Sequence, residues 1–404
     1  MPGIYLDHNS TTPVDPEVLR AMQPYSAEHF GNPSNLHAFG RDTREAIENA
    51  RAQVAVFLNA EPAEILFTSG GTEADNWAVK GVAAARAEKG RHIICSPIEH
   101  GAVLTTCQYL AQHGYELSLP PVDDTGLVDP GDIRRLIRKD TILVSVMLAN
   151  NEIGTIEPVR EIAAICRENG VLCHTDAVAA ATREELDVRK LGVDLLTISG
   201  HKIYGPKGVG CLYIRQGTPI HPLLHGGHQE QGLRGGTENL AGIVGLGKAC
   251  EIAVRDWRKN ACRLCELRDY LHRLIFDRIE EVRLNGHPTK RLCTTLHIAI
   301  GYIEGEALLV NLDLEGIAVA SGSACSSGES QPSSTLQAIH VPPQFINSPI
   351  RFSLGKENTR PEIEYTVDVL ERIVKRLRDI SPIWQDRGRK FFAPPQSCSA
   401  GEDR

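Results

Sequence analysis

Residues 195–210 read LLTISGHKIYGPKGVG, and this stretch decides the fold. It opens with a short apolar run, as a buried strand does, and the run ends directly at Ser199, His201 and Lys202. Ligands bind at such strand ends in open α/β sheets, and a lysine there can form a Schiff base with an aldehyde cofactor. Lysine is common on protein surfaces, so Lys202 alone would carry little weight.

Similar apolar runs lie before and after this stretch, and amphipathic segments separate them. The run at residues 142–148 (ILVSVML) does not alternate polar with apolar residues, which is typical of a strand buried on both faces of a parallel sheet. Residues 41–58 and 72–88 have the helical period. This alternation predicts an α/β fold whose mostly parallel central sheet is flanked by helices. The predicted strands are residues 64–68, 92–95, 142–148, 171–175, 195–199 and 209–214.

After residue 238 the pattern changes, and we expect a smaller α+β domain. We place the large domain at residues 15–258 and the small domain at residues 1–14 and 259–404. The tail after residue 380 is rich in proline, serine and charge, so we expect it to be extended. The elements predicted in this part are helices at 238–279, 304–314 and 361–378 and strands at 295–300, 317–320 and 350–354.

Composition and the start of the chain exclude several classes of protein. The 404 residues carry a net charge of −8 and no basic stripe, so we expect no nucleic-acid partner. No run of 18 apolar residues occurs, and the first residues lack the basic start and apolar run of a signal peptide, so we expect no membrane partner. The 11 cysteines are odd in number and scattered, which indicates reduced thiols, so we expect a cytoplasmic protein.

The run at residues 171–175 leads into Asp176. An aspartate at that end of a strand can pair with a protonated pyridine nitrogen and so keep the ring of such a cofactor electron-withdrawing. The alternative is that Asp176 caps the next helix, and taken alone this alternative has the stronger support.

A strand also gives way to a helix at residues 68–73 (TSGGTE). Small residues such as Gly71 let the backbone approach a phosphate, a helix N-terminus favours an anion, and the Thr72 hydroxyl can add a donor. The alternative is an ordinary glycine turn with Thr72 as the N-cap.

Cys325 lies among small polar residues at 321–328 (SGSACSSG), where little apolar burial is on offer. Such a thiol is available as a nucleophile, and the alternative is an incidental cysteine in a linker. Cys262 and Cys265 form a CxxC within a helical pattern that has no second ligand pair nearby, so we expect no metal site.

Arg351 stands between apolar residues in a strand pattern. A semi-buried arginine needs an anionic partner. A substrate carboxylate held by two hydrogen bonds would serve, and a structural salt bridge is an equally good alternative.

These pieces occur together and in an order that resembles the cysteine desulfurases. That family belongs to the aminotransferase class V group of fold-type I enzymes, which use pyridoxal 5′-phosphate (PLP). The resemblance covers nearly the whole chain, and the combination of SGHK at residues 199–202 with SGSAC at 321–325 separates desulfurases from most relatives. Other matching stretches are residues 5–7, 30–34, 68–73, 99–100, 150–154, 226–230, 235–239 and 351–354.

The resemblance implies how PLP is bound. Lys202 holds the cofactor covalently and later moves the α-proton of the substrate. Asp176 pairs with the pyridine nitrogen, and His100 stacks on the ring and serves as an acid or base. The residues implied to surround the phosphate are Gly71, Thr72, Ser199, His201 and, from the second subunit of a homodimer, Thr237.

The implied reaction converts L-cysteine to L-alanine and leaves the sulfur on Cys325 as a persulfide. Asn151 and Arg351 hold the substrate carboxylate in this scheme. The resemblance also implies an iron–sulfur scaffold protein as the sulfur acceptor. The long segment after Cys325 and the SPIW at residues 381–384 resemble the nitrogen-fixation and housekeeping types, and SPIW slightly favours the first.

One stretch departs from the family pattern. Three positions after Asp176 the family usually has a glutamine, which donates a hydrogen bond to the phenolic oxygen of PLP, and then a Val-Gly-Lys-like stretch. This chain has Ala179, followed by Ala-Ala-Thr-Arg, and Ser10 replaces a usual alanine. Losing such a hydrogen bond costs on the order of 1 kcal/mol. Either a water replaces it, or the cofactor electronics are weakened and the enzyme is slower.

Two other functions stay open at this point. One is another class V enzyme, such as a selenocysteine lyase or an aminotransferase, and an aminotransferase would not depend on Cys325. The other is a sulfur-relay or scaffold-binding homologue with weakened catalysis, which would stay colourless when PLP is added.

Overall fold

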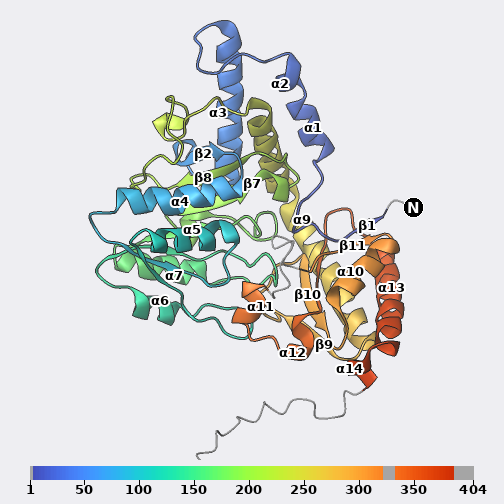
Figure 1. Cartoon of the computed structure of the whole chain (residues 1–404). Coiled ribbons are helices and arrows are strands. Elements are labelled where there is room, and N and C mark those ends of the chain that lie inside the picture. The colour runs from blue at the N-terminus through green and yellow to red at the C-terminus, as the bar shows by residue number, and fades with distance from the viewer. Residues whose placement is uncertain (1–2, 322–332, 386–404) are drawn as a thin grey trace, which may run out of the picture.

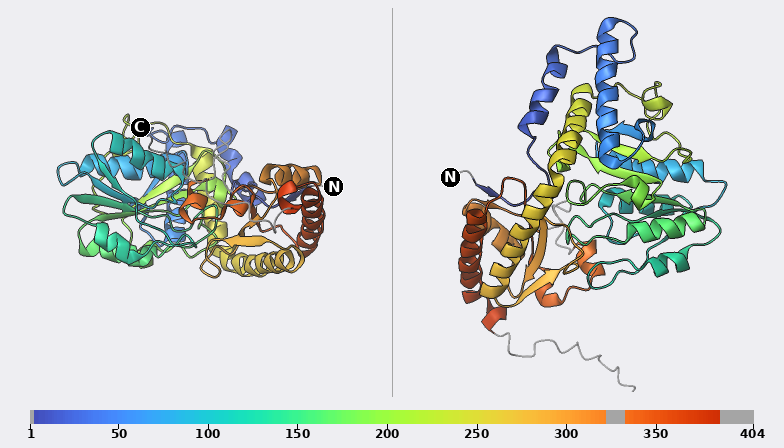
Figure 2. Two further views of the ribbon diagram at one scale, coloured as in Figure 1. Left: turned by 60° about the horizontal axis from the view of Figure 1, so that its bottom comes forward. Right: turned by 180° about the vertical axis from the view of Figure 1, so that it is seen from behind.

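The structure, a computed structural model, describes residues 3–321 and 333–385, and its elements gather around two groups of strands (Figures 1 and 2). The larger group is a seven-stranded sheet, and the smaller consists of a three-stranded and a two-stranded sheet. Cys325 lies outside the described residues. Among the described helices, none combines the length and the apolar character needed to cross a membrane.

The large sheet has the order β2-β8-β7-β6-β5-β3-β4. β8 is antiparallel to its neighbours β2 and β7, and every pair from β7 to β4 is parallel, which confirms the predicted mostly parallel sheet. The strands are β2 (Ile65–Thr68), β3 (His92–Cys95), β4 (Glu116–Ser118), β5 (Thr141–Ser145), β6 (Leu172–Asp176), β7 (Leu195–Ser199) and β8 (Gly210–Ile214).

Helices cover both faces of this sheet, so its strands are apolar on both sides. On β2, Ile65 and Phe67 belong to one buried core and Leu66 to the other, as the pleat requires. The first core includes residues of α3 (Ala38–Leu58), α7 (Val159–Glu168) and the first part of α9 (Leu240–Arg278). The second includes residues of α4 (Gly71–Ala85) and α5 (Gly101–Gln112).

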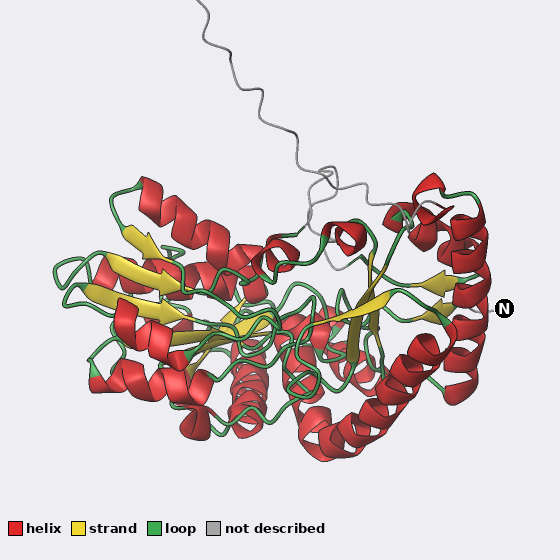
Figure 3. Cartoon of the chain, turned by 90° about the horizontal axis from the view of Figure 1, so that it is seen from below, coloured by secondary structure: helices red, strands yellow, loops and turns green. Residues whose placement is uncertain are grey.

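The smaller group of strands lies beside the first, and helices again lie on its outer side (Figure 3). Its antiparallel sheet has the order β12-β10-β9, and β1 pairs in parallel with β11. A separate core joins Leu271, Ile298, Phe352 and Leu370. The elements are β1 (Ile4–Tyr5), β9 (Val282–Asn285), β10 (Thr295–Ile300), α10 (Gly305–Leu314), β11 (Ile317–Ala318), β12 (Pro349–Ser353) and α13 (Arg360–Asp379).

The 39-residue helix α9 runs through both groups. Leu246 and Ala249 in its first half belong to the core of the large sheet, whereas Leu271 and Ile275 in its second half belong to the core of the small one. The predicted boundary at residue 258 therefore lies inside a continuous helix, and the division into residues 15–258 and the rest stays a prediction.

The tail after residue 380 is not extended at its start, because α14 forms there. Pro382 opens this short helix, a position that suits the fixed φ of proline. The ring of Trp384 lies 5.8 Å from that of Tyr302. The remaining elements are α1 (Pro16–Met22), α2 (Pro24–Ala27), η1 (Pro62–Glu64), α6 (Pro130–Leu136), α8 (Val188–Leu191), η2 (Gly200–Lys202), η3 (Glu230–Gly232), α11 (Ser334–Ala338), α12 (Pro343–Ile346) and α14 (Pro382–Gln385).

Thr182 has a left-handed backbone, with φ of 67°. A β-branched residue rarely adopts that conformation, which costs about 1–2 kcal/mol. We expect Thr182→Gly to raise the free energy of unfolding by up to about 1 kcal/mol, since glycine removes the steric cost but adds entropy to the unfolded chain. Thr182→Ala is the control, because alanine keeps most of the cost. Denaturant unfolding that finds the glycine variant no more stable than the alanine variant would contradict this expectation.

Candidate active site

A cavity of about 360 Å³ brings together nine of the eleven site residues predicted from the sequence. It lies where β6 and β7 end, at Asp176 and Ser199. Parallel strands end at the same edge of a sheet, so residues distant in sequence converge there. The nine are Gly71, Thr72, His100, Asn151, Asp176, Ser199, His201, Lys202 and Arg351.

The other two predicted residues do not line this cavity. Thr237 is exposed in the segment before α9. Cys325 falls outside the described residues, so its position stays a prediction.

Lys202 reaches the cavity from the tight turn η2, which directly follows β7. Gly200 permits this turn, because a Cβ there would lie only 2.8 Å from the carbonyl oxygen of Pro206. The Lys202 amine donates to the backbone oxygens of Asn9 and, at 2.8 Å, of Ser10. Burial, together with nearby arginines, lowers the pKa of Lys202 to about 8. A larger fraction of the amine is therefore neutral near pH 7, and the neutral amine is the nucleophile toward an aldehyde.

Asp176 is buried at the end of β6 and accepts a hydrogen bond of 2.8 Å from the backbone N–H of Val178. No helix begins directly after it, so the alternative of a helix cap is wrong. Possible ligand atoms of Asp75, His100 and Asp176 lie within 4.8 Å of one another. Burial raises the pKa of Asp176 and holds that of Asp75 well above its usual range, with Asp176 adding to the second shift.

Burial outweighs the favourable effect of the nearby Lys202 on Asp176, so a further cation would stabilise the charged form of this cluster. The Oδ1 of Asp75 is buried without a hydrogen-bond partner in the described part of the chain. His174, whose Nε2 lies 3.6 Å from that oxygen, is held neutral, because burial lowers its pKa to about 3. A protonated ring nitrogen entering the cavity would supply the missing charge.

The N-terminus of α4 opens on the same cavity. Gly70 is its N-cap and supplies no side-chain hydrogen bond, so the alternative of Thr72 as N-cap is wrong. A Cβ on Gly71 would lie 3.0 Å from Cγ2 of Val178, so a larger residue would crowd this end of the helix. The uncapped N–H groups of this 15-residue helix favour an anion. Beside them, burial lowers the pKa of His201 to about 4, so its neutral ring can donate one hydrogen bond.

Arg351 enters from β12 in the smaller sheet and is 2% exposed. Its Nη2 donates to Oδ1 of Asp7 at 2.8 Å and to the hydroxyl of Ser10 at 2.9 Å, and its Nη1 donates to the backbone oxygen of Asn151 at 3.0 Å. Its Nε has no partner among the described residues. Arg351 therefore forms the structural salt bridge, with Asp7. Its guanidinium also lines the cavity, where the Nε donor is available for a substrate carboxylate.

Sequence reasoning missed the contribution of residues 7–10. Three cations hold this segment: Arg351 through Asp7 and Ser10, Lys202 through Asn9 and Ser10, and Arg183 through a hydrogen bond of 3.2 Å to the carbonyl oxygen of His8. No local pattern could have found these contacts, since they join the start of the chain to residues more than 170 positions away. Asp75 was open to prediction, because it lies one helical turn after Gly71 on α4.

The chemistry of the cavity fits PLP. It offers an amine for the aldehyde at Lys202, a buried carboxylate for the ring nitrogen at Asp176, and a helix N-terminus at Gly71 for the phosphate. The orphaned Asp75 oxygen and the space kept open by Gly71 are features that a bound cation and a bound phosphate would satisfy.

Ala179 lines the cavity three residues after Asp176. We expect Ala179→Gln to shift the absorption band of bound PLP and to tighten its binding about fivefold, because a regained hydrogen bond contributes about 1 kcal/mol. Ala179→Met is the matched control, since it is similar in length but has no amide. A glutamine variant with the spectrum, PLP affinity and turnover of the wild type would leave a water molecule as the better account.

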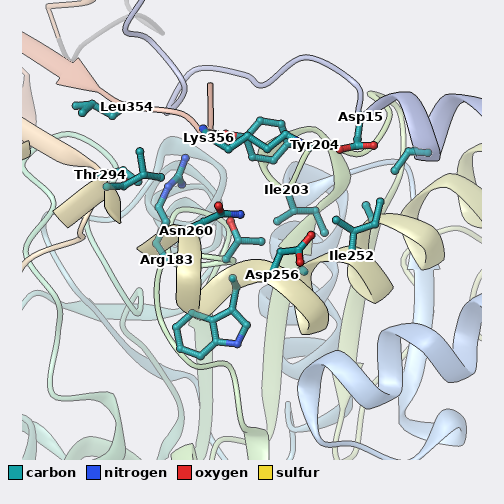
Figure 4. Close-up of a pocket in the computed structure, with 16 residues that line it drawn as sticks. Asp15, Arg183, Ile203, Tyr204, Ile252, Asp256, Asn260, Thr294, Leu354 and Lys356 are labelled. Atoms are coloured by element: carbon teal, nitrogen blue, oxygen red, sulfur yellow. Dashed lines mark hydrogen bonds and ion pairs between the residues drawn. The ribbon is translucent and has the colours of Figure 1, made fainter. Parts of the chain in front are cut away.

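The residues after Lys202 also line a second, smaller cavity of about 60 Å³ (Figure 4). The hydroxyl of Tyr204 accepts a hydrogen bond of 2.8 Å from the backbone N–H of Lys356, whose ammonium lies 4.6 Å from the centre of the Tyr204 ring. That ammonium also pairs with Asp15, the N-cap of α1. These contacts hold Tyr204 in place, and so stabilise the turn that carries Lys202 on the side away from the first cavity.

Comparison with known proteins finds relatives that match most of the chain. The family model described as aminotransferase class-V matches residues 4–366. The cysteine desulfurase IscS of Dictyoglomus turgidum is 53% identical over 383 residues, which cover 95% of this chain and 97% of that protein.

Two solved structures are also similar. One described as a NifS-like protein has a TM-score of 0.88 at 39% identity and covers 93% of this chain and 100% of its own. Another, described as SspA in complex with cysteine, has a TM-score of 0.78 at 33% identity and covers 88% of this chain and 100% of its own.

Proposed function

The chain belongs to the aminotransferase class V family, among its cysteine desulfurases, and from this premise we propose how its residues carry out the reaction. The enzyme depends on PLP and converts L-cysteine to L-alanine while its own thiol takes the sulfur. The observation that carries the assignment of residues is the single cavity in which Lys202, Asp176 and Arg351 meet.

Bound PLP supplies an electron sink that acidifies the α-proton of the substrate. Lys202 tethers the cofactor and carries that proton, which its lowered pKa of about 8 suits near neutral pH. Asp176 would keep the ring nitrogen protonated, and His100 would serve as a further acid or base. The phosphate would be held around the N-terminus of α4 by Gly71, Thr72, Ser199 and His201.

Cys325 takes the sulfur. Its thiolate forms a bond to the substrate sulfur while the bond between that sulfur and Cβ breaks, and the electron pair stays with the carbon skeleton, which is then protonated. One L-cysteine and one enzyme thiol thus give one L-alanine and one persulfide. A small thiol reductant or an acceptor protein then removes the outer sulfur.

Arg351 and Asn151 bind the substrate carboxylate in this proposal. We expect Arg351→Lys to raise the KM for L-cysteine about tenfold or more, because an ammonium cannot present two parallel donors while keeping the contacts to Asp7 and Ser10. Steady-state kinetics check this, and an unchanged PLP spectrum is the control for an intact cofactor site. A KM equal to that of the wild type would assign Arg351 to structure alone.

A homodimer would place Thr237 at the cavity of the other subunit. Two observations support it: Thr237 is exposed away from its own cavity, and Phe30, Leu36 and Phe39 are 69%, 84% and 58% exposed within ten residues of one another. Apolar side chains gathered in this way mark an interface. Light scattering of the purified protein tests this, and a monomer that turns over L-cysteine would contradict it.

The sulfur acceptor that we propose is an iron–sulfur scaffold protein, in the cytoplasm. The reduced state of the thiols supports this setting, since none of the nine described cysteines forms a disulfide. The sulfur serves either nitrogenase or general cluster assembly, and the SPIW at residues 381–384 slightly favours the first.

The test of the proposed function supplies purified enzyme with PLP, L-cysteine and dithiothreitol. We expect L-alanine and sulfide in equal amounts. Pyruvate and ammonia in place of L-alanine, or a protein that stays colourless with PLP, would contradict the proposal.

A further inference from the structure

A third cavity, of about 760 Å³, shares no lining residue with the candidate active site. Its lining residues are 121–123, 127–130, 132, 156–158 and 161, together with Lys290. We call it the acidic pocket, because it has five carboxyl groups against one ammonium. The acidic lining residues are Asp123, Asp129, Asp132, Glu157 and Glu161.

Glu157 marks the acidic pocket as a place for a cation. It is 3% exposed, and its Oε2 accepts a hydrogen bond of 3.0 Å from the backbone N–H of Val128. Its Oε1 has no partner in the described part of the chain. Burial, with Asp123 nearby, raises the pKa of Glu157 to about 8, as expected for a carboxyl that lacks a cation.

The spacing of the acids favours an extended cation over a metal ion. Within residues 3–321 and 333–385, the only His, Cys, Asp and Glu group whose ligand atoms all lie within 4.8 Å of one another is in the candidate active site. Asp129 caps α6 and Glu161 lies in the first turn of α7, so the carboxyl groups approach the acidic pocket from separate elements. A guanidinium, with five donors spread over a plane, can meet several such groups at once.

The acidic pocket lies close to the chain that follows Cys325. A Cβ on Gly126, which directly precedes the lining residue Leu127, would lie 3.6 Å from Cγ2 of Ile339. Next to it, Oδ1 of Asp124 is 3.7 Å from Nδ1 of His340. Ile339 directly follows α11, whose first residue comes nine positions after Cys325.

We propose that the acidic pocket binds an arginine side chain of the protein that accepts sulfur from Cys325. The identity of that partner rests on the proposed function. The arginine meets Glu157 at the base of the acidic pocket and Glu161 at its edge, and so anchors the partner beside the segment that delivers the sulfur.

The experiment uses holoenzyme and two blocked peptides, acetyl-Gly-Arg-Gly-amide and the same peptide with citrulline, which keeps the shape but loses the charge. Calorimetry at low salt is expected to detect binding of the arginine peptide and no binding of the citrulline peptide. Glu157→Gln/Glu161→Gln should weaken its binding about tenfold or more, and should slow sulfur transfer to a purified iron–sulfur scaffold protein. Glu266→Gln, an exposed acid on α9, is the matched control and should change neither measurement.

Equal affinity for the two peptides, or equal affinity of wild type and double variant, would overturn the proposal. So would Mg²⁺ binding that needs Glu157 while the arginine peptide does not bind. Glu161→Lys, a surface change, serves if the double variant does not fold, and should abolish peptide binding. L-alanine formation with dithiothreitol, measured in parallel, separates the two hypotheses. If no L-alanine forms, the proposed function is wrong even where the peptide binds. If L-alanine forms and the peptide does not bind, the proposal of an arginine site in the acidic pocket is wrong.

Discussion

Cys325→Ala is expected to reduce sulfide release from L-cysteine by about 10³-fold or more. Without a thiol to form the new sulfur–sulfur bond, the bond between Cβ and sulfur has no acceptor and does not break. PLP binding should be unchanged, because the groups proposed to hold the cofactor within one chain lie on β6, β7, η2 and α4 and just before α5. Sulfide and L-alanine assays, combined with the absorption spectrum of bound PLP, check both halves of this expectation.

Two controls make the Cys325 experiment decisive. Cys262→Ala removes the exposed thiol of α9 and should leave turnover unchanged. Exchange of the substrate α-proton with solvent deuterium should persist in Cys325→Ala, since we propose that Lys202 moves that proton. An alanine variant that still releases sulfide at the rate of the wild type would remove Cys325 from the mechanism and favour a lyase.

The strands that could be predicted from the sequence are those whose side chains are buried on both faces. β5 and β7 carry continuous apolar runs for this reason. β4 escaped prediction, because it has three residues at the edge of the sheet and begins with the exposed Glu116. β9 escaped as well, since it alternates with Arg283 and ends at Asn285.

The predicted strand at residues 142–148 is longer than the observed one, because an apolar run indicates which residues are buried and not which residues pair with a neighbouring strand. β5 ends at Ser145, although Val146 and Leu148 still donate to the backbone of β6. The apolar residues continue because the chain stays buried beyond the regular ladder. The burial of a residue can be predicted from the local sequence, whereas the end of a ladder of hydrogen bonds depends on the neighbouring strand.

The same distinction separates the predicted part of the candidate site from the missed part. Lys202, Asp176 and Gly71 follow strand runs directly, so the rule that parallel strands share one ligand-binding edge was enough to group them. Asn9 lines the cavity and Asp7 contacts Arg351, and the start of the chain is placed there by the pairing of β1 with β11, more than 300 positions later. Such a contact follows from tertiary packing and leaves no local pattern.

The second large effect is expected for Lys202→Ala, which should lower turnover by about 10²–10⁴-fold or more, because it removes both the tether of PLP and the group that moves the α-proton. Lys207→Ala, an exposed lysine five positions later, is the matched control and should keep full activity.

The pH dependence of cofactor loading tests the role of Lys202 without measuring turnover. Burial and the nearby Arg183 and Arg351 lower the pKa of Lys202 in the folded chain to about 8, from a usual value of 10.5. The neutral amine attacks the aldehyde, so covalent loading of PLP should accelerate as pH rises from 7 and level off above about 8.5. With a normal pKa the acceleration would continue to about pH 10. Arg351→Gln removes one of the two cations and should move the plateau to higher pH, whereas a plateau that stays in place would mean that burial and Arg183 set the pKa of this amine without Arg351.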